Sequence, residues 1–198
     1  MISGLTARQS IGGTLVLLLF AAGAAAVACA RWTRPIAEGD RALADGRLEQ
    51  ALSAYTRAER RFDALPVARQ ILARDYHRLV ANQLLIDYRL RRFDELIDRA
   101  QRAPEAAAPH FWAGLALLAK GRADEDPDAQ LAWLTRAEEE LRRAVEAAPE
   151  DWDTKFNFEL VTRLAAAVRK QPKAPPSELM QVLRPPPKSG ARPARRVG

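Results

Sequence analysis

The sequence predicts an all-α protein in which an apolar N-terminal helix precedes a small array of packed helices. Three observations support this prediction. Residues 11–30 form an uncharged, apolar stretch. Between Pro35 and Lys170, apolar residues recur with the 3.6-residue period of a helix, and no segment alternates as a strand would. Residues that break helices interrupt the period at short intervals, at Gly46, Pro66, Pro104, Gly121, Pro127 and Pro149.

The apolar stretch at 11–30 follows a short leader at 1–10. It is long enough to form a single transmembrane anchor, because a spanning helix needs about 20 apolar residues. Two processed forms remain as alternatives. Residues 26–28 fit the small-x-small pattern of signal-peptide cleavage, and Cys29 behind them loosely resembles a lipidated lipoprotein cysteine.

The orientation of this anchor depends on opposing signals. Arg31 and Arg34 follow the segment, whereas only Arg8 precedes it, and this distribution slightly favours a cytoplasmic body. The short leader favours export of the body. We expect a single-pass protein of the inner (cytoplasmic) membrane whose body faces the periplasm.

The body at 35–170 contains several amphipathic helices in succession. One stripe runs from Leu48 to Leu65, and a long helix is predicted from about Ala68 to Leu90. Further stripes run over 111–118, 131–148 and 156–168. Short breaks between such helices favour antiparallel packing of neighbours.

The spacing of small and aromatic residues then suggests a repeat. The residues Gly39, Gly46, Ala51, Tyr55 and Ala58 stand at intervals that resemble the tetratricopeptide (TPR) unit. A second match joins Trp112 and Leu115 to Ala137, Leu141, Ala144 and Pro149. Residues 91–104 resemble a shortened second helix between them. Asp63 stands where a proline would close the first unit, so a generic helix bundle remains the alternative to a small TPR-like helical-repeat array.

The net charge of +6 belongs mainly to the two ends of the chain. Residues 1–34 hold three arginines and no acid, and residues 171–198 hold six basic residues and one acid, so the body carries a net charge of −2. Proteins that bind nucleic acid place their basic residues on a folded face. We therefore expect no nucleic-acid partner, and we interpret 171–198 as a disordered, proline-rich basic tail.

Catalytic and metal-binding constellations are missing from the sequence. The two histidines, His77 and His110, have no ligand partner at helical spacing, and Cys29 lies inside the apolar stretch. Asp124, Asp126 and Asp128 alternate as in a calcium loop, but the required glycine and glutamate are replaced by Ala129 and Thr135. We interpret Asp126 or Asp128 as a helix cap, and we assign the same role to the acids around Trp152. The prediction is a protein that is not an enzyme and that has no cofactor and no metal site.

A stacked array of helix pairs offers a concave surface for a protein segment. From the repeat alignment, the residues predicted to face that groove and bind a partner are Arg78, Leu85, His110 and Lys120.

The last helix begins with an acidic-Trp-acidic pattern followed by Asn-x-Glu-Leu, formed by Asp151, Trp152, Asp153, Asn157, Glu159 and Leu160. With the anchor and the irregular repeats, this pattern resembles the small membrane-anchored proteins encoded with MoxR-type ATPases and von Willebrand A-domain (VWA) proteins. It is most similar to the MxaK-type accessory proteins of methanol dehydrogenase gene clusters. The resemblance implies a role in maturing a periplasmic dehydrogenase, including its calcium loading, with a VWA/MoxR-type complex or dehydrogenase subunits as partners. A general cell-envelope scaffold is the alternative. We further expect Trp152 and Phe156 to be packing residues of a terminal capping helix.

Overall fold

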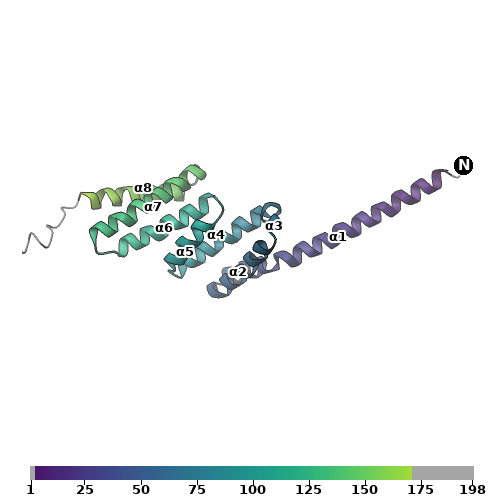
Figure 1. Ribbon diagram of the computed structural model, residues 1–198, viewed down its shortest axis with the longest axis horizontal. Coiled ribbons are helices and arrows are strands. Elements are labelled where there is room, and N and C mark those ends of the chain that lie inside the picture. Colours follow the sequence, from purple (N-terminus) through teal and green to yellow (C-terminus); the bar gives the residue numbers. More distant parts are fainter. Residues whose placement is uncertain (1–2, 171–198) are drawn as a thin grey trace, which may run out of the picture.

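The computed structural model describes residues 3–170, with side chains from Val16 onward, and confirms the all-α prediction. The described residues form helices and no strand (Figure 1). The predicted tail at 171–198 lies outside the described residues. In chain order the helices are α1 (Ser3–Ala44), α2 (Leu48–Ala64), α3 (Val67–Ile71), α4 (Ala73–Arg89), α5 (Phe93–Arg102), α6 (Ala107–Ala123), α7 (Pro127–Ala147) and α8 (Trp152–Arg169).

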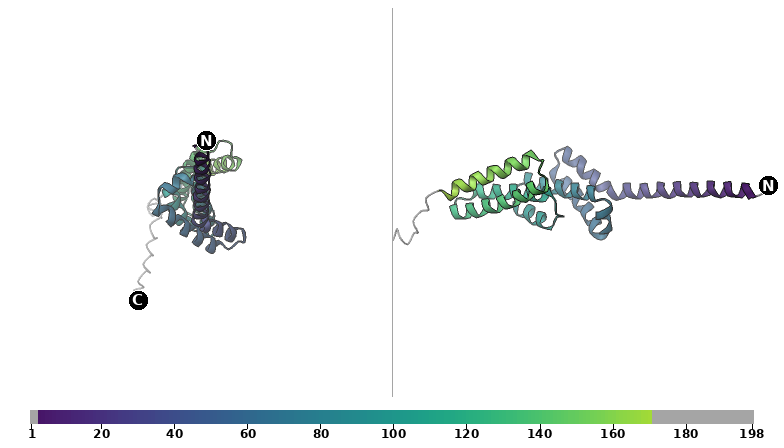
Figure 2. Two further views of the ribbon diagram at one scale, coloured as in Figure 1. Left: turned by 90° about the vertical axis from the view of Figure 1, so that its right-hand side faces the viewer. Right: turned by 90° about the horizontal axis from the view of Figure 1, so that it is seen from above.

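Helix α1 is one continuous helix whose N-terminal part projects away from the packed helices, as Figures 1 and 2 show. Its span Val16–Ala44 contains a window with a mean hydropathy of 1.7, and none of that window is buried against the rest of the protein. By length and composition, α1 is therefore a candidate membrane-spanning helix. The C-terminal part of the same helix packs against α2 and is the first helix of the array, so no linker separates the candidate span from the packed helices.

Pro35 lies inside α1 and has no N–H group, so the carbonyl of Arg31 loses its usual intrahelical donor. The guanidinium of Arg61, near the end of α2, replaces that donor. Its Nη1 atom donates to the carbonyl oxygens of Arg31 at 2.9 Å and of Trp32 at 2.6 Å. A proline that would otherwise weaken α1 thus becomes the point where α2 is attached to it.

The helices pack as successive antiparallel pairs, α1 with α2, α4 with α5 and α6 with α7, and α8 covers α7. The first and third pairs each contain a close contact between a glycine of the first helix and a large side chain of the second helix. A Cβ atom on Gly39 would lie 2.6 Å from the ring of Tyr55, and one on Gly114 would lie 2.5 Å from Leu141. Tyr55 and Leu141 are each flanked by buried alanines four residues before and three residues after them. These are the small and large positions expected of a TPR-like unit.

The middle pair keeps the same turn but exchanges the sizes of the two side chains. Gly46 and Arg91 both have positive φ, 73° and 58°, at the turn between the two helices of a pair. Seven residues before each turn residue stand Gly39 and Leu84, and nine residues after stand Tyr55 and Ala100. A large residue replaces glycine at the first position, and a small one replaces tyrosine at the second, so the packed volume is conserved.

The core between the first and second pairs contains a buried charge. Asp87 is 1% exposed and accepts a hydrogen bond from Nε of Arg99 at 2.9 Å. Arg99 also pairs with Glu59 at 3.4 Å, and Glu59 accepts from Gln83 at 3.0 Å. This network connects α2, α4 and α5. Burial raises the pKa of the Asp87 carboxyl, although its hydrogen bond with Arg99 acts in the opposite direction.

The predicted helix from Ala68 to Leu90 is wrong in one respect, because it is divided at Leu72 into α3 and α4. Leu72 leaves the helical region with φ −111° and ψ 37°. The predicted break at Gly121 is also wrong. Gly121 is buried inside α6, where a Cβ atom would lie 3.2 Å from Cβ of Trp133. The chain leaves α6 only at the aspartates before Pro127.

The predicted caps are confirmed at Asp126 and Asp151, whose side chains accept hydrogen bonds from the backbone N–H groups two residues later. The prediction that Trp152 and Phe156 are packing residues is wrong, because they are 78% and 66% exposed. Helix α8 instead buries Thr154, Val161 and Ala165. These residues follow helical spacing on the face opposite Phe156, so they turn the two aromatic side chains toward solvent.

Candidate partner-binding surface

Two of the predicted partner-binding residues, Arg78 and Leu85, lie on α4. Arg78 is exposed, and its Nη2 atom lies 3.4 Å from Oδ2 of Asp40 and 3.3 Å from Oδ1 of Asp75. Leu85 is half-buried. The contact with Asp40 brings the end of α1 and the start of α4 to one surface.

A polar cluster fixes this junction. The Tyr55 hydroxyl donates to Oδ1 of Asp40 at 2.6 Å, and Nδ2 of Asn82 donates to the Tyr55 oxygen at 2.8 Å and more weakly to Asp40 at 3.4 Å. Burial, reinforced by the Asp40 carboxylate, raises the pKa of Tyr55 far above its ordinary value. Tyr55 therefore remains a neutral donor, and the first helices of two pairs are held in a defined position.

The other two predicted residues, His110 and Lys120, lie toward opposite ends of α6 and contact the second helices of the pairs. The Lys120 ammonium pairs with Asp94 of α5 and lies 4.5 Å above the ring of Trp133 in α7. Among the described residues, no hydrogen bond or ion pair joins any two of Arg78, Leu85, His110 and Lys120.

A two-residue shift in alignment explains this separation. The prediction aligned the third pair from Trp112 and Leu115, but the close contact with Leu141 makes Gly114 the equivalent of Gly39. In the corrected register, His110 matches the buried residues Pro35 and Val80. Trp112 then matches Asn82, and Leu115 matches both Asp40 and Leu85.

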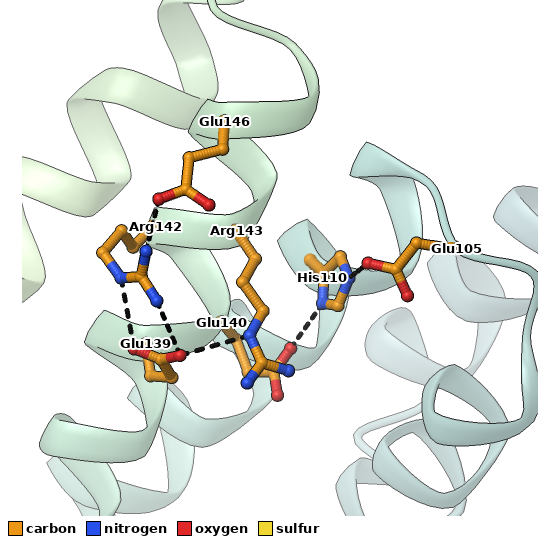
Figure 3. A network of polar contacts seen from close by, with 7 residues as sticks. All are labelled: Glu105, His110, Glu139, Glu140, Arg142, Arg143 and Glu146. Atoms are coloured by element: carbon orange, nitrogen blue, oxygen red, sulfur yellow. Dashed lines mark hydrogen bonds and ion pairs between the residues drawn. The ribbon is translucent and has the colours of Figure 1, made fainter.

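His110 instead borders a cavity of about 200 Å³ lined by residues of α5, α6, α7 and the loop before α6. Figure 3 shows its ring between two carboxylates, with Nδ1 2.7 Å from Glu140 and Nε2 2.7 Å from Glu105. Burial lowers the pKa of His110, but the two carboxylates together outweigh burial, and the pKa is raised overall. The ring of His110, in contact with a carboxylate at each nitrogen, thus links the loop at Glu105 to α7.

The remaining charges in Figure 3 form an ion-pair network on the surface of α7. Arg142 pairs with Glu139 at 2.8 Å and also with Glu146, and Arg143 pairs with Glu139 at 3.2 Å. These pairs follow the i,i+3 and i,i+4 spacing of one helix, and exposed pairs of this kind contribute little to stability.

An aromatic cluster joins α4, α5 and α6, and the sequence did not predict it. Tyr88 of α4 lies 5.8 Å from Phe93 of α5 and 5.5 Å from Trp112 of α6, and Trp112 lies 5.3 Å from Phe111, all between ring centroids. The four side chains are half-buried. Such rings can pack in the fold and still present an edge to a partner.

The acidic loop before α7 uses its carboxylates within the protein. Asp124 accepts from Nε1 of Trp133 at 3.1 Å and from the backbone N–H of Asp126 at 3.1 Å. Within residues 3–170, no group of three histidine, cysteine or acidic side chains is placed to hold a metal ion. His77 is exposed and lies edge-on to Tyr76.

The sequence matches no family profile and no curated protein sequence. Two solved structures are similar in fold. The first TPR domain of Spaghetti (RPAP3) bound to the HSP90 peptide SRMEEVD has a TM-score of 0.50 at 17% identity, over 68% of this chain and 93% of that one. The first TPR domain of human RPAP3 has a TM-score of 0.50 at 15% identity, over 72% of this chain and 98% of that one. The chain thus has a TPR-like fold.

Proposed function

We propose that the protein is a non-catalytic, membrane-anchored adaptor that binds a protein segment on the surface formed by the first helices of its pairs. The TPR-like stacking carries this proposal, because such arrays expose a continuous surface along their first helices. One of the structural neighbours named above is bound to a peptide. The apolar part of α1 would hold this surface at a membrane.

The binding surface, called here the first-helix surface, comprises Arg78, Asn82, Leu85, Trp112 and Leu115. Its polar end is ordered by the Asp40–Tyr55–Asn82 hydrogen bonds, and its other end is apolar and aromatic. An extended segment that offers apolar side chains and a hydrogen-bonding group fits such a surface. His110 and Lys120 contact the second helices α5 and α7 instead of the first helices, so we assign recognition to Arg78 and Leu85.

The sequence resemblance supports a more specific role. We propose that the partners are subunits of a methanol dehydrogenase or a VWA/MoxR-type complex that matures it, and that the anchor lies in the inner membrane with the body in the periplasm. The alternative is a cell-envelope scaffold of a MoxR/VWA-type complex unrelated to methanol oxidation. A reporter fused after Gly198 would report the side of the membrane, and a cytoplasmic result would exclude a direct periplasmic partner.

Site-specific photo-crosslinking in the host membrane tests the adaptor function. A photoreactive amino acid replaces Leu85 in the full chain, and a matched control replaces the exposed Thr135 on α7. We expect one defined protein to be crosslinked from position 85 and not from position 135. Crosslinking to a dehydrogenase subunit or a VWA-domain protein would support the specific role, whereas another envelope protein would support the alternative. The same products from both positions would contradict the first-helix surface.

A further inference from the structure

We propose that the corner formed by residues 65–71, which joins α2 to α4 and contains α3, rests on the membrane surface and binds anionic lipid headgroups. This inference rests on the proposed membrane anchoring by α1. It adds a second membrane contact, made by the folded body itself.

The position of the corner relative to the axis of α1 is the main evidence for this contact. Helix α2 runs antiparallel to α1, and Arg61 lies beside Arg31 and Trp32, whose carbonyl oxygens it binds. The rings of Trp32 and Phe62 confirm this level, with centroids 6.4 Å apart. Leu65 stands four residues beyond Arg61, which is about 6 Å farther along a helix that rises 1.5 Å per residue.

The same distance along α1, measured back from Arg31, reaches Val27. This residue is 57% exposed and belongs to the apolar stretch. Leu65, where the corner begins, is therefore level with the C-terminal part of the apolar stretch at 11–30, at the end of the body from which α1 projects (Figure 1). If α1 crosses a bilayer with this stretch, the corner lies close to the membrane surface.

The side chains of the corner suit this position. Leu65 is 46% exposed, Val67 is 50% exposed and Ile71 is 75% exposed. Single exposed apolar residues are common, but here three lie within seven residues beside an apolar helix. Apart from α1, the other large apolar side chains exposed in the described residues are Trp152 and Phe156, on α8.

The positive charge around the corner favours anionic lipid headgroups. Residues 57–74 contain five arginines and only two acids, Glu59 and Asp63. Arg60 and Arg74, which flank the corner, are exposed and form no ion pair within residues 3–170. Arg31 and Arg34 lie at the same end of the body, where the apolar stretch finishes. Apolar side chains inserted between headgroups, with arginines beside them, are typical of binding to an anionic bilayer surface.

Fluorescence quenching by lipids with nitroxide labels near the headgroup tests this proposal on the full chain. In a Cys29→Ser background, single cysteines are introduced as Ile71→Cys, as Val27→Cys to report the anchor, and as Ala147→Cys to report an exposed site on α7. Each variant carries an environment-sensitive fluorophore and is reconstituted into phosphatidylcholine vesicles with or without phosphatidylglycerol. Circular dichroism verifies that helix content is unchanged.

We expect the labels at positions 27 and 71 to be quenched and the label at 147 to remain bright. Quenching at 71 should weaken without phosphatidylglycerol. A quenched label at 27 with an unquenched label at 71 would overturn the proposed corner contact and leave the anchor intact. An unquenched label at 27 would overturn the anchor and, with it, this inference. Equal quenching at 71 in both lipid mixtures would overturn the selection of anionic headgroups.

Discussion

The close contact between Gly39 and Tyr55 predicts a specific loss of stability in the Gly39→Ala variant. The new Cβ atom would lie 2.6, 2.7 and 2.9 Å from three carbons of the Tyr55 ring. Non-bonded carbons prefer a separation of about 3.5–4.0 Å. The ring is fully buried and is held by its 2.6 Å hydrogen bond to Asp40, so it cannot move without weakening that bond.

Two effects determine the expected magnitude. Overpacking a core costs about 1–3 kcal/mol, and alanine in place of glycine within a helix gains about 1 kcal/mol. Because the ring is held in place, we expect a cost near the upper limit and a net destabilisation of about 2 kcal/mol. Urea unfolding of the full chain in detergent, followed by circular dichroism, measures this difference.

Two comparisons separate the steric effect of the Gly39–Tyr55 contact from the general effect of replacing glycine by alanine in a helix. Gly23→Ala is the matched control, since a Cβ atom on Gly23 would have nothing within 4 Å, and it should not lower stability. In a Tyr55→Leu background, Gly39→Ala should cost less than in the native chain, because the smaller side chain leaves room. If Gly39→Ala is as stable as Gly23→Ala, the packing described for the first pair is wrong.

Three further predictions concern polar groups, each measured as the free energy of unfolding of the full chain. The pKa of His110 is raised in the folded state, so the extra stability from its charged ring should be fully present at mildly acidic pH and be lost as the pH rises through the raised pKa. The difference in stability between the native chain and His110→Gln should therefore shrink at alkaline pH, where the neutral ring can donate only one hydrogen bond, and a pH-independent difference would contradict this. Arg99→Met should cost about 3 kcal/mol at neutral pH, because it leaves the Asp87 carboxylate buried without its partner. That deficit should shrink on acidification as Asp87 binds a proton, and a deficit that grows would exclude the buried-charge explanation. Asp126→Ala should cost about 1 kcal/mol through loss of the cap of α7, whereas Asp126→Asn should retain most of the stability.

The sequence correctly predicted helices in which the apolar stripe ends where a helix-breaking residue stands. It did not predict features that depend on the backbone conformation of a single residue. Helix α2 was predicted from Leu48 to Leu65 and is found at Leu48–Ala64. The break at Leu72 changes the direction of the chain but leaves the apolar residues on both sides in nearly the same period. Periodicity therefore could not reveal it. Gly121 was interpreted as a break because helix interiors rarely favour glycine, although here close packing against α7 requires it.

The candidate surface depended on contacts between residues far apart in the chain. The hydrogen bond from Asn82 to Asp40 connects residues 42 positions apart, and no local pattern predicts it. The structure places His110 against α7 and not beside Arg78, and the sequence did not reveal this because the alignment followed Trp112. The seven-residue spacing of Gly114 and Gly121, which repeats that of Gly39 and Gly46, was the signal that would have given the correct register.

The most direct test of the adaptor proposal is the affinity of the crosslinked partner for two charge-reversed variants. Arg78→Glu changes an exposed residue on the first-helix surface, and Arg142→Glu changes an arginine of similar exposure on α7. We predict a higher Kd for Arg78→Glu, by about tenfold if one charge-assisted contact of about 1.5 kcal/mol is lost. We predict an unchanged Kd for Arg142→Glu. Equal affinities of the two variants, or weakening by Arg142→Glu alone, would contradict the assignment of partner binding to the first-helix surface.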